Sequence, residues 1–307
     1  MIRRTSGTST VSARDGTTLV VREWESAATR WGSVLLVHGL GEHSGRWERV
    51  GAQLAAAGLG VAAFDLRGHG SSGGVRAHAD RWSDLLDDVG DRLTSARVPG
   101  LPAVLYGHSF GGLLCTDYLL SRSPAPDLAV LSAAALGDNA SAALHRLAPL
   151  IARVRPKLAL ANPFSPDELS RDPSVAAAYR EDPLVLSKTT TRMGALIFAA
   201  TDDVNARLAA GERLPCPTLV IHGEADPIVP LASTEPLAAA GATRRTLPGV
   251  LHESHNDPDG PAIVADVIDW LRAEAAAGAG RPGEVEGEVA GAVAGAVAGA
   301  DPPIIAT

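Results

Sequence analysis

The feature that most constrains the fold is a serine flanked by glycines, set between an apolar run and a helical pattern. The apolar run over 103–106 leads directly into the G-x-S-x-G sequence of residues 107–111, and a helical pattern follows over 110–120. So sharp a turn strains the backbone of the serine and exposes its hydroxyl at the N-terminus of the helix. The pattern therefore predicts a strand–turn–helix unit that presents Ser109 as a nucleophile.

Short apolar runs alternate with helical patterns along most of the chain. Such alternation is typical of an α/β fold, in which helices flank a mostly parallel sheet. Strands are expected over 17–25, 33–37, 61–64, 103–106, 128–132, 217–221 and 243–247, and helices over 47–57, 82–96, 110–120 and 261–274.

The alternation stops between about Leu136 and Ala200. No strand is expected there, and prolines divide the segment into several helical stretches. We interpret 136–200 as a helical cap inserted into a core made of 11–135 and 201–275, preceded by a flexible N-terminus over 1–10.

The end of the chain, over 276–307, has a different composition. Nearly all of its residues between Gly278 and Ala300 are Gly, Ala, Val or Glu, with a near-repeat of Val-Ala-Gly-Ala. Because it can bury little apolar surface to offset the entropy of ordering, we expect a disordered tail. The alternative is a segment that docks on a partner.

Charge and cysteine content exclude several classes of protein. The chain has 27 Lys and Arg against 35 Asp and Glu, a net charge of −8, which argues against general affinity for nucleic acid. Its two cysteines, Cys115 and Cys216, make neither a metal-ligand cluster nor a disulfide framework. We expect no metal, no cofactor and no protein partner.

The N-terminus lacks the apolar stretch of a signal peptide, and no segment has the roughly 18 uncharged apolar residues of a membrane span. A cytoplasmic, soluble protein is the expectation from these two observations.

A serine hydroxyl needs a general base, and the chain has nine histidines. In the chain order Ser…Asp…His, the base lies in the loop after the last strand, which contains His252 and His255. We predict that His252 is the base and that His255, beside a second turn, is an exposed loop residue. His108 is expected to point away from the hydroxyl; His38, His69 and His222 sit beside glycines at strand ends or turns.

The acid must lie between the serine and the histidine in the chain. Asp226 follows the strand expected over 217–221, where its carboxylate can accept from the far imidazole nitrogen. Glu224 is interpreted as a solvated loop charge, and Asp202 and Asp203 as charges at a helix start. Asp226 is therefore the predicted third member of the triad.

The negative oxygen of a transition state needs backbone N–H donors. One is expected from Phe110, the residue after the nucleophile, and the other from Leu40, in the glycine-rich loop after the strand at 33–37.

Seven short stretches of the chain form recognisable sequence motifs. They are His38–Arg46, Asp65–Ser71, Gly107–Gly112, Ser170–Pro173, Asp182–Leu184, His222–Asp226 and Pro248–Glu253. Together they resemble the monoacylglycerol lipase and lysophospholipase branch of the α/β-hydrolases, over about residues 10–273. In one place the chain departs from the branch: Ser254, His255 and Asn256 follow Glu253, where a large apolar residue and then Asn are usual.

The resemblance implies an α/β-hydrolase fold with a helical lid over an apolar acyl channel, and no metal or organic cofactor. It also implies hydrolysis of carboxylic esters through an acyl-enzyme, with monoacylglycerols as substrates. In that branch Asp65 and Arg67 would hold a turn.

One segment of the cap carries both apolar and basic residues. The apolar residues Leu144, Leu147, Ile151, Val154 and Leu158 recur at helical spacing, and Arg146, Arg153, Arg155 and Lys157 lie among them. This face either packs over the core or contacts acyl chains and a lipid surface, with Leu147 and Ile151 as candidate substrate-binding residues. Pro149 and Pro156 predict two short helices here.

The same residues bear on three other classes of protein. A lysophospholipase or general carboxylesterase would use the same triad, so the leaving group stays open. Epoxide hydrolases and haloalkane dehalogenases would need Asp in place of Ser109. A binding protein without catalysis would normally lack one of the three triad residues.

Overall fold

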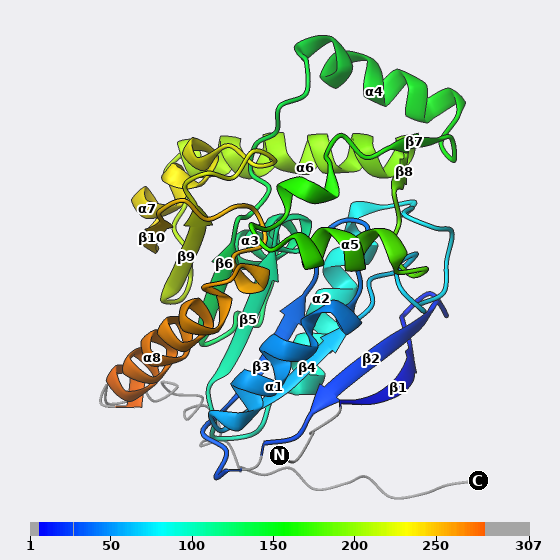
Figure 1. The fold of residues 1–307 in the computed structure, drawn as a ribbon. Coiled ribbons are helices and arrows are strands. Elements are labelled where there is room, and N and C mark those ends of the chain that lie inside the picture. Colours follow the sequence, from blue (N-terminus) through cyan, green and yellow to red (C-terminus); the bar gives the residue numbers. More distant parts are fainter. Residues whose placement is uncertain (1–5, 27, 280–307) are drawn as a thin grey trace, which may run out of the picture.

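One eight-stranded sheet runs through the centre of the computed structural model (Figure 1), which describes residues 6–26 and 28–279. Its strand order is β1-β2-β4-β3-β5-β6-β9-β10, with β1 and β2 antiparallel at one edge and the remaining strands parallel from β4 onward. The strands are β1 Gly7–Ser12, β2 Thr18–Trp24, β3 Gly32–Val37, β4 Leu59–Phe64, β5 Ala103–His108, β6 Leu128–Ser132, β9 Thr218–Gly223 and β10 Thr243–Leu247.

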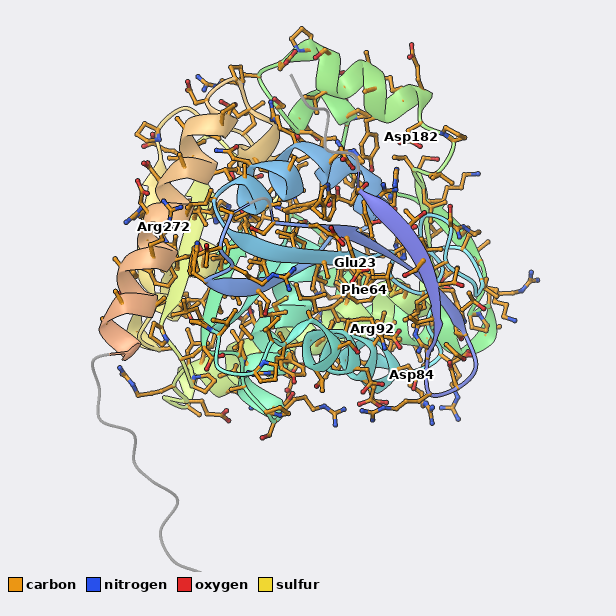
Figure 2. All side chains as sticks on the ribbon, turned by 90° about the horizontal axis from the view of Figure 1, so that it is seen from below. Glu23, Phe64, Asp84, Arg92, Asp182 and Arg272 are labelled. Carbon is orange, nitrogen blue, oxygen red and sulfur yellow. The ribbon has the colours of Figure 1, made fainter. Side chains whose placement is uncertain are left out.

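Helices cover both faces of the sheet, so the four central strands β3, β5, β6 and β9 are buried along their whole length. Alternate residues of β3 point to opposite layers: Leu35 packs toward α2, α3 and α6, and Leu36 packs toward α1 and α8. Figure 2 shows Phe64 in the interior and Arg272 at the periphery on α8. The helices are α1 Glu48–Ala56, α2 Trp82–Ala96, α3 Phe110–Ser121, α6 Thr191–Ala209, α7 Glu235–Ala239 and α8 Gly260–Ala279.

Short elements between β6 and α6 lie over one end of the sheet, with α4 farthest from it (Figure 1). They are α4 Ala142–Val154, β7 Ala159–Ala161, the 3-10 helix η2 Pro166–Glu168, α5 Pro173–Glu181 and β8 Lys188–Thr190. The expectation of no strand in this segment was wrong, because β7 and β8 pair antiparallel. Each of these strands has three residues, which is too short for an alternating hydrophobic pattern to be recognised in the sequence.

The expectation of two short helices around Pro149 was also wrong. The helix α4 continues through Pro149 and ends at Val154, ahead of Pro156. A proline inside a helix removes one backbone hydrogen bond, and the remaining turns hold where the helix packs on a neighbour. Ala148 and Ala152 supply that packing, since both are buried in the face that α4 presents to α6.

The predicted flexible N-terminus was wrong for residues 7–10, which belong to β1. The strand is exposed along nearly its whole length, so it carries no apolar alternation, and its support is the backbone ladder to β2. At the other end, the disordered tail predicted over 276–307 was wrong for 276–279, because α8 extends to Ala279; the rest of that prediction lies outside the described residues. No helix within 6–279 is long and apolar enough to cross a membrane.

Candidate active site

Ser109 occupies the turn between β5 and α3, where the backbone is strained. Its φ is 52° and its ψ is −117°, a left-handed conformation that a residue other than glycine adopts only at a cost. The turn is packed so closely that a Cβ atom on Gly111 would overlap the carbonyl oxygen of Val37, and one on Gly107 would overlap that of Gly111. These contacts explain the two glycines of the motif.

The structure brings the three residues predicted as a triad together. His252 Nε2 lies 2.9 Å from Ser109 Oγ, and His252 Nδ1 lies 2.7 Å from Asp226 Oδ2. Because a carboxylate only accepts hydrogen bonds, Nδ1 carries the hydrogen and Nε2 is free to accept from the serine hydroxyl. The three residues come from loops at the carboxyl ends of β5, β9 and β10.

The side chain of Asp226 is fully buried, and both of its carboxylate oxygens accept hydrogen bonds. Oδ1 accepts from the backbone N–H groups of Ile228 and Val229, at 2.8 and 3.0 Å. Oδ2 accepts from His222 at 3.1 Å as well as from His252. Burial alone would raise the pKa of Asp226, but the hydrogen bonds from His222 and His252 outweigh it and hold that pKa well below its usual range.

The glycine-rich loop after β3 lies beside the nucleophile. Leu40 and Phe110 both line the cavity that contains Ser109. Phe110 is the first residue of α3, so its N–H group has no partner within the helix. The N–H of Gly39 already donates to Glu42 Oε1, at 2.5 Å.

A buried ion cluster lies next to the triad. Arg46 Nη1 bonds Glu42 Oε2 at 3.0 Å and Glu253 Oε1 at 2.5 Å, and its guanidinium lies 4.8 Å from the ring centre of Tyr179 on α5. Burial would raise the pKa of Glu253, and Arg46 more than reverses this and lowers it well below its usual range. From the sequence, Glu42 and Arg46 were recognisable only as members of a motif, and their opposite charges four residues apart are the signal that could have identified the pair.

The prediction that His255 is exposed was wrong. It is only 1% exposed and stacks on Trp47, with ring centroids 4.3 Å apart and planes at 19°. Its ring also meets the edge of His108, at 4.9 Å. A turn does follow His255, since the N–H of Gly260 donates to the carbonyl oxygen of Asp257 at 2.8 Å. His255 itself lies in a 3-10 helix over Ser254–Asn256 and packs inward against Trp47.

Although the sequence around Asn256 departs from the pattern of the branch, this asparagine contacts the residue next to His252. Asn256 Nδ2 donates to Glu253 Oε2 at 2.8 Å, so this asparagine supports the residue that follows the triad histidine.

Two motifs of the cap fasten it to the loops of the site. Ser170 Oγ donates to the carbonyl oxygen of Asn256 at 3.0 Å, and Arg171 Nε bonds Asp257 at 2.9 Å, so the first motif holds the loop of His252. Asp182, in the second motif, lies 2.9 Å from His43 Nε2 in the loop that contains Leu40.

Asp65 and Arg67 hold a turn away from the reacting atoms. Asp65 accepts from the backbone N–H groups of Ser44 and Ser71, each at 2.8 Å, and Arg67 forms a paired contact with Asp88 at 2.7 and 2.9 Å.

A cavity of about 410 Å³ lies between the triad and the cap, and its lining is mostly apolar. Ile151 lines this cavity, as do Leu144 and Ala148 on the same face of α4. Leu147 does not line it and is 51% exposed, because it falls on the outer face of the helix together with Leu150 and Val154.

Within the described part of the chain, no three His, Cys, Asp or Glu side chains are grouped so as to hold a metal ion. Both cysteines are free thiols; Cys115 is buried and Cys216 is half-buried.

Comparisons with known proteins give consistent matches. A family model described as serine aminopeptidase, S33, matches residues 29–259. A monoacylglycerol lipase from Mycolicibacterium smegmatis is 32% identical over 280 residues, covering 88% of this chain and 99% of that protein. A monoglyceride lipase from Homo sapiens is 31% identical over 223 residues, covering 69% of this chain and 71% of the relative. The crystal structure of a monoacylglycerol lipase from Paleococcus ferrophilus superposes with a TM-score of 0.76 at 31% identity, over 83% of this chain and 99% of the other.

Proposed function

The chain belongs to the serine aminopeptidase S33 family of α/β-hydrolases, and on that basis we propose that it hydrolyses monoacylglycerols through an acyl-enzyme on Ser109. The observation that carries the proposal is the hydrogen-bonded series Ser109–His252–Asp226 beside an apolar cavity. In this proposal Ser109 is the nucleophile, His252 the general base and Asp226 the acid that orients it.

Acylation begins when His252 Nε2 takes the hydroxyl proton and Ser109 Oγ attacks the ester carbonyl carbon. The carbonyl oxygen becomes negatively charged as the tetrahedral intermediate forms. When that intermediate collapses, the bond to the glycerol oxygen breaks and His252 donates its proton to that oxygen. Water then attacks the acyl-enzyme by the same steps, releasing the fatty acid and restoring Ser109.

We assign the oxyanion donors to the backbone N–H groups of Leu40 and Phe110. Phe110 is supported by its place at the start of α3, where the N–H is free of the helix. Leu40 is favoured over Gly39 because Glu42 already accepts the hydrogen of the Gly39 N–H group. Such donors contribute to catalysis because they face charge that develops only in the transition state.

The proposed substrate class follows from the two kinds of side chain, apolar and charged, that line the cavity. Apolar side chains of the cap, including Ile151 and Phe198, suit an acyl chain. Glu42, Arg46 and Glu253 line it as well and suit the hydroxyl groups of glycerol. The relatives named as monoacylglycerol lipases point to the same substrate.

A transient contact between the cap and a lipid surface forms part of the proposal. Leu147, Leu150 and Val154 are 51%, 61% and 75% exposed on the outer face of α4. Between residues 139 and 166 the chain has four cations and no acidic residue, in a protein of net charge −8. Exposed aliphatic side chains beside cations suit an interface with anionic head groups. A cytoplasmic location stays a prediction from the sequence.

The experiment that tests the substrate is a panel of esters given to the purified protein at equal concentration. It contains monoacylglycerols of several chain lengths, lysophospholipids and short nitrophenyl esters. We expect the highest kcat/KM with a monoacylglycerol. A preference for lysophospholipids would move the assignment to a lysophospholipase, and a preference for the short esters would move it to a general carboxylesterase.

A further inference from the structure

The carboxylate of Asp226 binds two imidazoles through the same oxygen. His252 Nδ1 lies 2.7 Å from Oδ2, and His222 Nε2 lies 3.1 Å from it. His222 is the fifth residue of β9, four positions before Asp226, and it is fully buried. In the catalytic steps proposed for Ser109, His252 alone of these two histidines takes part.

The neighbours of His222 determine which of its nitrogens carries hydrogen. Nε2 faces two acceptors, Asp226 Oδ2 and the carbonyl oxygen of Val229 at 3.2 Å, so Nε2 must be a donor. Nδ1 faces the hydroxyl of Thr234 at 3.0 Å, and Arg244 Nε lies 3.4 Å from that hydroxyl oxygen. The ring is therefore held from both sides with its N–H directed at the carboxylate.

The donors around Asp226 fall into two groups. The backbone donors of Ile228 and Val229 fix Oδ1, whereas among the described residues the two histidine rings alone donate to Oδ2. A hydrogen bond to a carboxylate spreads its charge and lowers its attraction for other protons. The N–H of His222 therefore competes with the imidazolium that forms on His252 during catalysis.

We propose that His222 is a positioning residue that holds the Asp226 carboxylate beneath His252 and sets the pH at which the base becomes available. This inference rests on the proposed triad. The titratable or charged groups packed around the pair are His108, 4.8 Å from His252, with His255 beside His108, and Arg244 behind Thr234. The carboxylate of Glu253, next to His252 in the chain, is paired with Arg46, which also binds Glu42. His222 lies behind Asp226 and does not line the cavity, so it acts through the carboxylate.

Three substitutions separate the donor from the volume of the side chain. His222→Gln places an amide N–H near the position of Nε2, and His222→Asn places it one methylene short. His222→Met has the length of glutamine without a donor. If His222→Asn does not fold, His222→Met is the variant compared with His222→Gln. For each variant we would measure kcat and KM with a short soluble ester over a pH series, together with the melting temperature.

We expect His222→Gln to stay within about threefold of the wild-type kcat, with the acid limb of its kcat/KM profile unmoved. His222→Asn and His222→Met should lose about tenfold or more in kcat with KM unchanged. Their acid limb should move up by about half a pH unit or more, because a carboxylate with one donor fewer stabilises the imidazolium better.

Equal behaviour of the glutamine and methionine variants, at either wild-type or reduced activity, would overturn the role of His222. So would a loss of kcat in His222→Met that follows the melting temperature with no movement of the acid limb. Failure of the proposed triad looks different, since the wild-type protein would then hydrolyse no ester at any pH. A substrate preference other than monoacylglycerols would leave this comparison intact, because it is made with a short soluble ester.

Discussion

His255 stacks on Trp47 at 4.3 Å, and within the described residues neither of its ring nitrogens has a hydrogen-bonding partner. A buried polar atom without a partner costs about 1–3 kcal/mol relative to a satisfied one. His255→Phe keeps a flat ring against Trp47 and removes both nitrogens. We therefore expect the free energy of unfolding to rise by about 1–2 kcal/mol, measured by urea denaturation. A fall in stability would mean that the nitrogens are hydrogen-bonded, for example by buried water.

Buried histidines also predict how stability depends on pH. Burial lowers the pKa of His255 to about 3, and that of His38 to about 3, from an ordinary value of 6.5. Between these values the unfolded chain binds protons that the folded protein does not, so stability falls as the pH is lowered from about 6.5 towards 3.

In His255→Phe one of these groups is absent, so the decline in unfolding free energy between pH 6.5 and 4.5 should be smaller than in the wild type. Urea midpoints at several pH values measure it. Parallel declines in the two proteins would show that His255 takes up its proton in the folded state as well.

Asp226→Asn should lower kcat by about 10,000-fold. The amide oxygen must face the backbone donors of Ile228 and Val229, so the NH₂ group faces His252. It then donates to Nδ1 and moves the ring hydrogen to Nε2, which can no longer accept from Ser109. Because triad residues act as a unit, Asp226→Asn combined with His252→Ala should be little worse than the worse single variant. A loss under tenfold in Asp226→Asn would contradict this geometry.

The two faces of α4 can be tested separately. Ile151→Asp puts a charge into the cavity and should reduce hydrolysis of all long-chain esters, whether dispersed or aggregated. Leu147→Asp changes only the outer face and should reduce hydrolysis of aggregated long-chain esters alone. A short soluble ester is the control: Leu147→Asp should cleave it at the wild-type rate, and Ile151→Asp should lose much less on it than on long-chain esters. Equal effects of Leu147→Asp on dispersed and aggregated substrate would contradict the proposed contact between α4 and a lipid surface.

Much of the core could be predicted from the sequence because its signals are local. The strand–turn–helix unit around Ser109 needs only adjacent residues, and its neighbours in the parallel sheet are apolar runs with long helices between them. The predicted α/β-hydrolase fold is confirmed by the match to the Paleococcus ferrophilus structure, and the family by the model over 29–259.

What could not be predicted depends on contacts distant in the sequence. The exposed strand β1 exists through its pairing with β2, and α4 passes Pro149 because it packs on α6. His255 and His222 looked like ordinary loop and strand-end residues, since their partners Trp47 and Asp226 become neighbours only in the folded chain.

The most direct test of the account is covalent labelling of Ser109. The purified protein is incubated with a fluorophosphonate, and in parallel with a long-chain nitrophenyl ester under rapid acid quench, and the modified peptide is identified by mass spectrometry. We predict one label per chain on Ser109, a transient acyl group on the same residue, and neither in Ser109→Ala, whose ester hydrolysis should fall at least about 1,000-fold. Ester hydrolysis near the wild-type rate by Ser109→Ala, freed of contaminating hydrolases, would contradict the account.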